Sequence, residues 1–121
     1  MPSPSAITTC RFERGGAIIR AISGDVDLAT AAQFRAAVDD IVEGCPAAMV
    51  IDLSAVSFLA SAGLQILTMA RQNLCPAGRF AVVADGPATS RPIQMTKLDE
   101  VFALYPTLVD ALDGLSTDKT A

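Results

Sequence analysis

Hydrophobic residues along the chain follow two alternating spacings, which predict strands that alternate with helices. Residues 7–13 and 17–23 are two β-favouring runs separated by an Arg-Gly-Gly sequence, and a Gly-Gly pair is a common signal for a tight hairpin turn. Residues 47–53 (AAMVIDL) are almost continuously apolar, as expected of a strand covered on both faces. The pattern therefore predicts an opening antiparallel hairpin and a central strand.

Between these strands, apolar side chains recur at the three- and four-residue spacing of a helix. Thr30 and Gln33 form a candidate capping box and Gly44 is expected to end the helix, which is predicted over residues 30–43. A second helix is predicted over residues 61–74, where apolar residues fall on one stripe and a Cys-Pro pair follows.

The rest of the chain repeats this rhythm with a strand at 79–84, a helix at 89–98, a strand at 101–105 and a helix at 107–115. Strands that alternate with helices indicate βαβ units with right-handed crossovers. The sequence therefore predicts an α/β fold: a mixed, mostly parallel sheet with an N-terminal antiparallel hairpin and about four helices.

Composition indicates the size of the domain, its location in the cell and the kinds of partner it can have. The chain has 121 residues, of which 51% are hydrophobic and 18% charged, so we expect one domain with its core over about 7–115 and flexible ends at 1–6 and 116–121. No apolar run approaches the roughly 20 residues of a membrane span, and the first residues do not resemble a signal peptide. We therefore expect a cytoplasmic protein without a membrane partner.

The net charge of −4 and the scattered basic residues argue against a nucleic-acid partner.

The chain contains no histidine, which removes the Ser-His-Asp and Cys-His arrangements of hydrolytic enzymes. We therefore do not expect an enzyme. The enzymatic alternative is a small hydrolase or transferase that uses Ser61 or Cys75 as its nucleophile.

Cysteines number three, Cys10, Cys45 and Cys75, and none forms a CxxC pair. The sequence therefore suggests neither a disulfide framework nor a metal site, and it indicates no cofactor. The three residues are expected to be small free thiols. A thiol switch through one pair stays open as an alternative, although the sequence offers no geometry for it.

Functional groups in open α/β sheets gather where strand carboxyl ends meet helix amino ends. In this chain the rule selects three loops, at residues 24–30, 54–62 and 85–89. Ser61 lies at or next to the start of the second predicted helix. On the residues alone it is interpreted as an N-cap, because serine is among the residues that cap helices best.

The order of motifs around Ser61 changes this interpretation. The strand "MVIDL", the loop "SAVSFLASAG" and the helix start "LQIL" follow one another, preceded by "ISGDVDLATA". Over about residues 7–115 the chain resembles the STAS domains, and most closely the single-domain bacterial anti-sigma factor antagonists. The residues that carry the resemblance are Gly24, Asp27, Thr30, Asp52, Leu53, Ser54, Val56, Phe58, Ser61, Gly63 and Leu64.

The resemblance implies a mechanism. Ser61 aligns with the serine that is phosphorylated by a partner anti-sigma factor, an ATP-dependent serine kinase, and that a serine phosphatase resets. The unphosphorylated antagonist binds that partner and frees a sigma factor. Two neighbours depart from the family: Ala60 stands where many members have Asp, and Ala62 replaces a frequent second serine. The alternative is a STAS scaffold or regulatory subunit of a stress-signalling or transporter-associated complex without a kinase switch.

The partner is expected to contact the surface around Ser61. Asp27 has two open interpretations, a helix cap or a partner contact, whereas Gly63 is expected to have a geometric role and Asp52 to accept hydrogen bonds from loop N–H groups. Phe58 is expected in the core. The predicted contact residues are Gly24, Asp27, Thr30, Ser57, Ser61, Ala62 and Gln65.

Overall fold

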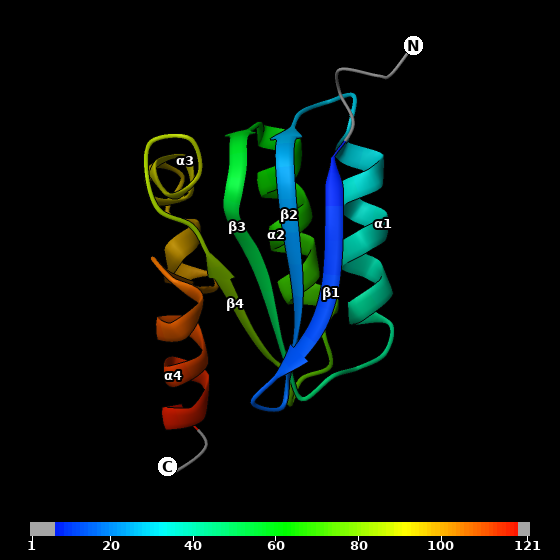
Figure 1. Ribbon diagram of the computed structural model, residues 1–121, viewed down its shortest axis with the longest axis vertical. Coiled ribbons are helices and arrows are strands. Elements are labelled where there is room, and N and C mark those ends of the chain that lie inside the picture. The colour runs from blue at the N-terminus through cyan, green and yellow to red at the C-terminus, as the bar shows by residue number, and fades with distance from the viewer. Residues whose placement is uncertain (1–6, 119–121) are drawn as a thin grey trace.

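The computed structural model describes residues 7–118, which form a five-stranded sheet with helices on both faces (Figure 1). The strands are β1 (Thr8–Arg14), β2 (Ala17–Val26), β3 (Ala48–Leu59), β4 (Arg79–Val83) and β5 (Ala103–Tyr105). The helices are α1 (Ala31–Val42), α2 (Ser61–Asn73), α3 (Ser90–Met95) and α4 (Leu108–Asp118), with a short 3₁₀ helix at Leu98–Glu100. Within the described residues, no helix combines the length and the apolarity needed to cross a membrane.

The sheet has the order β1-β2-β3-β4-β5, in which β1 and β2 are antiparallel and every later pair is parallel. Gly15 and Gly16 form the hairpin turn with φ values of 60° and 83°, which glycine adopts without a steric cost. The predicted α/β fold with a mixed sheet and an N-terminal hairpin is confirmed.

Two apolar layers hold the fold together. Helices α1 and α2 lie side by side on one face of the sheet, where Phe34 and Leu67 are packed in the same core as Ile51 of β3 (Figure 1). Helix α4 lies on the other face, where Leu115 joins a second core with Val50. Neighbouring residues of β3 thus face opposite layers, which explains the continuous apolar run predicted to be a central strand.

The main difference from the predicted boundaries is in β3, which continues to Leu59 through residues predicted to be a loop. Between Ala21 and Ser23 of β2, and again between Gly24 and Asp25, β3 contains one more residue than β2. These bulges interrupt the two-residue alternation that identifies a strand in a sequence. The loop prediction over 54–59 is therefore wrong.

The predicted capping box of α1 is also wrong. Thr30 occupies the N-cap position, but its side chain makes no capping hydrogen bond. The Gln33 side chain instead accepts a hydrogen bond from the Ile7 N–H through Oε1, at 3.3 Å. The helix start is held by the preceding loop.

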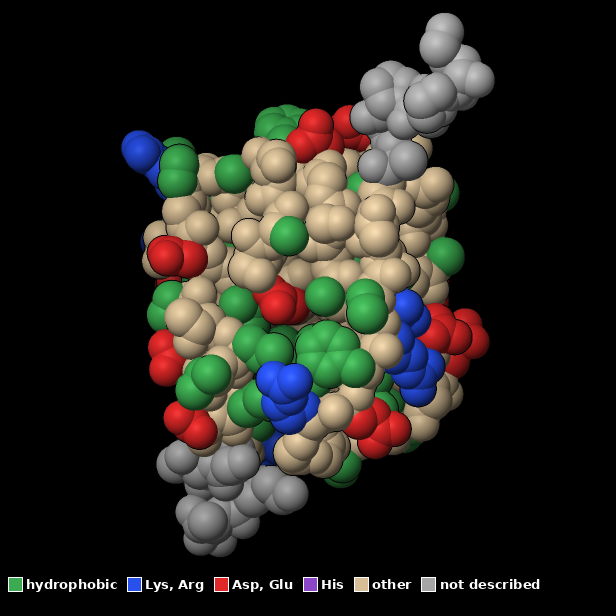
Figure 2. Space-filling view, in the orientation of Figure 1, with side chains coloured by type: hydrophobic (Ala, Val, Ile, Leu, Met, Phe, Trp, Pro, Cys, Tyr) green, Lys and Arg blue, Asp and Glu red, His purple; other side chains and the backbone are tan. Residues whose placement is uncertain are grey.

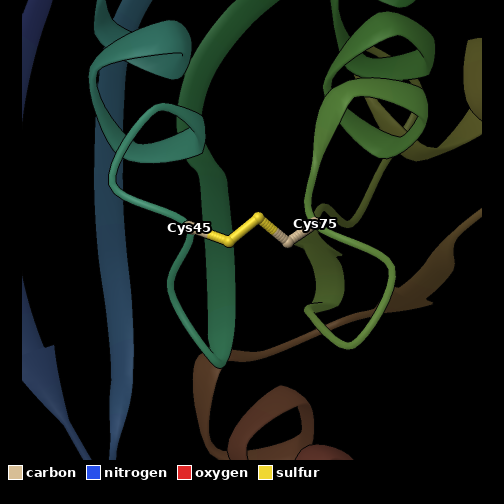
Figure 3. Close-up of a disulfide and its surroundings, with 2 residues drawn as sticks. All are labelled: Cys45 and Cys75. Carbon is tan, nitrogen blue, oxygen red and sulfur yellow. A yellow bond between two sulfur atoms is a disulfide. The ribbon is translucent and has the colours of Figure 1, made fainter.

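Cys45 and Cys75 form a disulfide, so the free-thiol prediction is wrong for these two residues and holds for the exposed Cys10 (Figure 3). The physical reason is that α1 and α2 end next to each other, which brings the two Cα atoms to 5.6 Å although the residues are 30 positions apart. Of the predicted flexible ends, residues 1–6 and 119–121 lie outside the described part of the chain, and α4 continues to Asp118.

Candidate functional site

Ser61 is the first residue of α2, and its side chain is exposed. The N-cap residue is Ala60, and the helix has no side-chain capping bond. The N-cap interpretation of Ser61 is therefore wrong, and its hydroxyl has no hydrogen-bond partner among residues 7–118. The N–H groups of Ser61 and Ala62 are in the first turn, where no intrahelical acceptor exists. The site thus combines a reachable hydroxyl with free backbone donors.

The start of α2 is fixed against the ends of β2 and β3. The Ala60 N–H donates a hydrogen bond to the Val26 carbonyl at 2.8 Å, and Val26 pairs with Leu59 across the strands. A Cβ on Gly63 would lie 2.6 Å from Leu59 Cδ1 and 2.8 Å from Val26 Cγ1. Only glycine lets the helix approach this closely, and the geometric role predicted for Gly63 is confirmed.

The segment before α1 is held by reciprocal hydrogen bonds. Asp27 Oδ1 accepts a bond from the Thr30 N–H at 3.0 Å, and the Thr30 hydroxyl oxygen accepts one from the Asp27 N–H at 2.9 Å. That hydroxyl donates to the Asp25 carbonyl at 2.7 Å. Asp27 therefore holds the loop at the N-cap residue Thr30 and makes no capping bond to the first turn of α1. Thr30 is 0% exposed, so it holds the loop and presents no contact surface itself. Gly24, with φ 106°, allows the strand irregularity just before this loop.

Apolar side chains are exposed on both segments that flank Ser61. Phe58 is 51% exposed, so the prediction that it belongs to the core is wrong. The physical reason is the extra residue Ser57 in β3, which leaves Ser57 and Phe58 both outside while Leu59 is buried. Leu28, which is 86% exposed, was missed by the sequence analysis. The available signal was a single leucine within the polar segment "GDVDLAT".

These residues lie at one end of the molecule, where the carboxyl ends of β2 and β3 meet. Asp25 pairs with Phe58 in the sheet, and Leu28 follows in the next loop. Figure 2 shows hydrophobic side chains beside acidic ones at this end. We call this surface the docking rim. Its residues are Gly24, Asp27, Leu28, Ser57, Phe58, Ser61 and Gln65.

A groove of about 290 Å³ runs between α1 and α2 and begins beside Ser61. Ala32 and Arg35 line it from α1, and Ala62, Gln65 and Met69 line it from α2. The fold thus brings the predicted contact residues Ala62 and Gln65 into one surface with α1. It does not bring the residues of the loop at 85–89 into this groove.

Two further observations concern the carboxylates and the possible metal ligands of the chain. Asp52 Oδ1 accepts a hydrogen bond from the Ser54 N–H at 2.9 Å, so the structural role predicted for Asp52 is confirmed. In the part of the chain that the structure describes, no group of three His, Cys, Asp or Glu side chains is placed to hold a metal ion.

Comparisons with known proteins cover most of the chain. The family model of the STAS domain matches residues 12–111. The anti-sigma-F factor antagonist RsfB of Mycobacterium tuberculosis is 43% identical over 115 residues, which cover 95% of this chain and 94% of that protein.

Solved structures of similar proteins extend the comparison. The crystal structure of an anti-sigma factor antagonist from Mycobacterium paratuberculosis is 45% identical, covers 96% of this chain and 99% of its own, and has a TM-score of 0.91. The phosphorylated form of the Bacillus cell fate determinant SpoIIAA is 19% identical, covers 91% of this chain and 99% of its own, and has a TM-score of 0.65. This more distant likeness concerns the fold.

Proposed function

The chain belongs to the STAS domain family, and from this premise we propose that it is an anti-sigma factor antagonist switched by phosphorylation of Ser61. In this proposal the protein is a cytoplasmic, non-enzymatic regulator. Its unphosphorylated form binds an anti-sigma factor with ATP-dependent serine kinase activity, which releases a sigma factor. Phosphorylated Ser61 prevents that binding, and a serine phosphatase restores it. Two similar proteins, at 43% and 45% identity, are anti-sigma factor antagonists, which supports the role of antagonist.

The observation that carries the proposal is the exposed Ser61 hydroxyl at the first position of α2. A kinase needs a hydroxyl that it can reach and that is not engaged in holding the fold, and Ser61 meets both conditions. A phosphate adds about −1.5 to −2 charge. At a helix amino terminus, the free N–H groups and the helix dipole stabilise such a charge by about 0.3–1 kcal/mol. The modified chain therefore keeps its fold.

The switch acts through the docking rim. Leu28 and Phe58 supply exposed apolar area on the segments that follow β2 and end β3, next to the start of α2, so a partner seated on them reaches the serine. An unmodified hydroxyl is small and neutral, whereas a phosphate in the same place has to be desolvated under the partner. The carboxylates of Asp25 and Asp27 favour a partner face that carries Lys or Arg. A phosphate on Ser61 changes both the shape and the charge of the surface that this partner contacts.

The direct test compares Ser61→Ala with Ser61→Glu in a binding assay with the cognate anti-sigma factor. Ser61→Ala is expected to bind as the wild type does, and Ser61→Glu at least about tenfold more weakly, because it places a charge under the partner. The matched control is Ser54→Glu, which adds the same charge at another exposed serine, on β3. Equal binding by the two Ser61 variants would contradict the switch.

A second experiment tests the kinase. Incubation with the anti-sigma factor and ATP, followed by mass spectrometry, is expected to place one phosphate on Ser61 and none on the exposed neighbours Ser54 and Ser57. Ser61→Ala is expected to remain unmodified. Binding without modification of the wild type would instead favour the scaffold or regulatory-subunit alternative, which needs no kinase.

A further inference from the structure

The Cys45–Cys75 disulfide links the loops that follow α1 and α2 (Figure 3). We propose that this pair is a reversible thiol–disulfide exchange site whose oxidation state tunes the affinity of the docking rim for its partner. The tuning rests on the proposed function, and so does the cytoplasmic location from which the reversibility is argued, whereas the reduction of the bond can be measured without a partner. The site lies one helix length, about 20 Å, from Ser61, because Ser61 begins α2 and Cys75 follows its end.

The bridge is placed for reaction with a reductant. Cys45 is exposed and Cys75 is half-buried, so we assign Cys45 as the residue that an attacking thiolate reaches first. Stable disulfides are rare in reducing compartments, where such bonds are usually transient. A disulfide at the surface of a cytoplasmic regulator therefore indicates a bond that forms and breaks.

Each of the two linked loops also has main-chain hydrogen bonds of its own. The Cys45 N–H donates to the Val42 carbonyl at 3.0 Å, and the Cys75 carbonyl accepts a bond from the Gly78 N–H at 2.7 Å. These main-chain bonds hold each loop from its own side. Neither cysteine belongs to the apolar cores of the described residues. Reduction therefore opens a link between two loops without removing a core contact, and the two thiols remain close enough to join again.

The link is mechanically connected to the docking rim through α1 and α2. These helices lie side by side (Figure 1), and the groove between them begins at Ala62, next to Ser61. Small and flexible side chains line this groove, among them Ala32, Gln65 and Met69. A covalent link at one end of the pair restricts how far the helices separate at the other. The oxidised form is thus pre-organised for the partner, and pre-organisation lowers the entropic cost of binding.

The reductant is a dithiol of the thioredoxin class. Its first thiolate attacks Sγ of Cys45, which forms a mixed disulfide and releases Cys75 as a thiolate that takes up a proton. The second thiolate of the reductant then attacks the reductant's first sulfur in the mixed disulfide. This step closes the disulfide of the reductant and releases Cys45 as a thiolate, which takes up a proton. The protein disulfide gains two electrons and two protons, and the dithiol becomes a disulfide. The reverse sequence with an oxidised dithiol closes the bridge.

The test uses the full chain carrying Cys10→Ser, which removes the exposed free thiol of β1. The protein is equilibrated with oxidised or reduced dithiothreitol, alkylated and weighed by mass spectrometry. The oxidised form is expected to take up no alkyl group and the reduced form two, under conditions in which the protein stays folded. A pair that stays resistant to reduction in the folded protein would overturn the exchange site.

Coupling to the rim is measured in the same two states. Affinity for the cognate anti-sigma factor is expected to fall about fivefold on reduction, and amide hydrogen exchange in the first turn of α2 is expected to become faster. A Cys45→Ser/Cys75→Ala variant in the same background is expected to match the reduced form in both buffers.

Each result decides a different point. Equal or tighter binding by the reduced form would overturn the coupling. Absence of binding in both states would contradict the proposed function instead. The hydrogen-exchange comparison then decides the coupling without a partner: faster exchange at Ser61 and Ala62 after reduction supports it, and identical exchange overturns it.

Discussion

At the scale of single residues, Ala60 occupies the N-cap of α2 with a side chain that cannot accept a hydrogen bond. Aspartate at an N-cap accepts a bond from a first-turn N–H and interacts favourably with the helix dipole. We expect Ala60→Asp to raise the free energy of unfolding by about 1 kcal/mol, measured by urea denaturation at neutral pH. Ala60→Asn supplies the acceptor without the charge and is expected to give a similar gain. A loss of stability in both variants would contradict the helix start described here.

Gly63 provides a second test at this scale, because a methyl group there meets Leu59 and Val26 at less than ordinary contact distance. We expect Gly63→Ala to lower the free energy of unfolding by about 1–3 kcal/mol, the usual cost of overpacking. Gly44→Ala is the matched control, since its Cβ would have only the Ile41 carbonyl at 3.5 Å nearby. That variant is expected to be neutral or slightly stabilising in the same denaturation experiment.

Residue roles were predictable where one local rule decides them. Gly63 and Asp52 follow from backbone geometry and from side-chain bonding two residues along the chain, and both predictions are confirmed. Thr30 and Phe58 were not predicted correctly, because their surroundings offer more than one arrangement. The Thr30 hydroxyl is drawn into the preceding loop, and Phe58 is turned outward by an extra strand residue.

At the scale of elements, the second half of β3 shows why the alternation of buried and exposed residues does not always identify a strand. Val56 and Leu59 are buried three positions apart, because the bulge at Ser57 adds a residue between them. A spacing of three residues between buried apolar positions indicates a loop or a helical turn and not a strand. The same bulge creates the site, since it places Phe58 at the surface beside the segment that carries Leu28.

Leu28 and Phe58 give the prediction that belongs to these elements. We expect Leu28→Ser and Phe58→Ser each to weaken binding of the anti-sigma factor by about tenfold or more, because full burial of a Leu or Phe side chain under a partner contributes about 1.5–3 kcal/mol. Stability is expected to change by less than about 0.5 kcal/mol in Leu28→Ser, since that side chain is 86% exposed. Binding is measured by titration calorimetry.

The matched control for this surface is Met95→Ser on α3, where the side chain is 73% exposed. It removes a similar apolar area outside the docking rim and is expected to leave affinity unchanged. Equal weakening by Met95→Ser and Leu28→Ser would show that the partner does not select this rim.

At the scale of the whole molecule, the order of strands and helices was predictable because each βαβ unit has one favoured handedness. The Cys45–Cys75 pair was not predictable. Three cysteines allow three different pairs, and the choice is made only when α1 and α2 end at the same edge of the sheet. The local sequence around each cysteine does not indicate that these two helix ends lie next to each other.

The bridge also predicts how the molecule as a whole responds to reduction. Closing a loop between residues 30 positions apart restricts the unfolded chain, and the chain-entropy model gives a stabilisation of about 3.5 kcal/mol. The Cys45→Ser/Cys75→Ala variant is expected to unfold at a lower urea concentration than the oxidised wild type, and the wild type in reductant is expected to match it. Both are expected to unfold in one cooperative transition, because the two apolar cores contain neither cysteine. A reduced chain without a cooperative transition would show that the bridge is required for folding, and such a bond cannot serve as a switch.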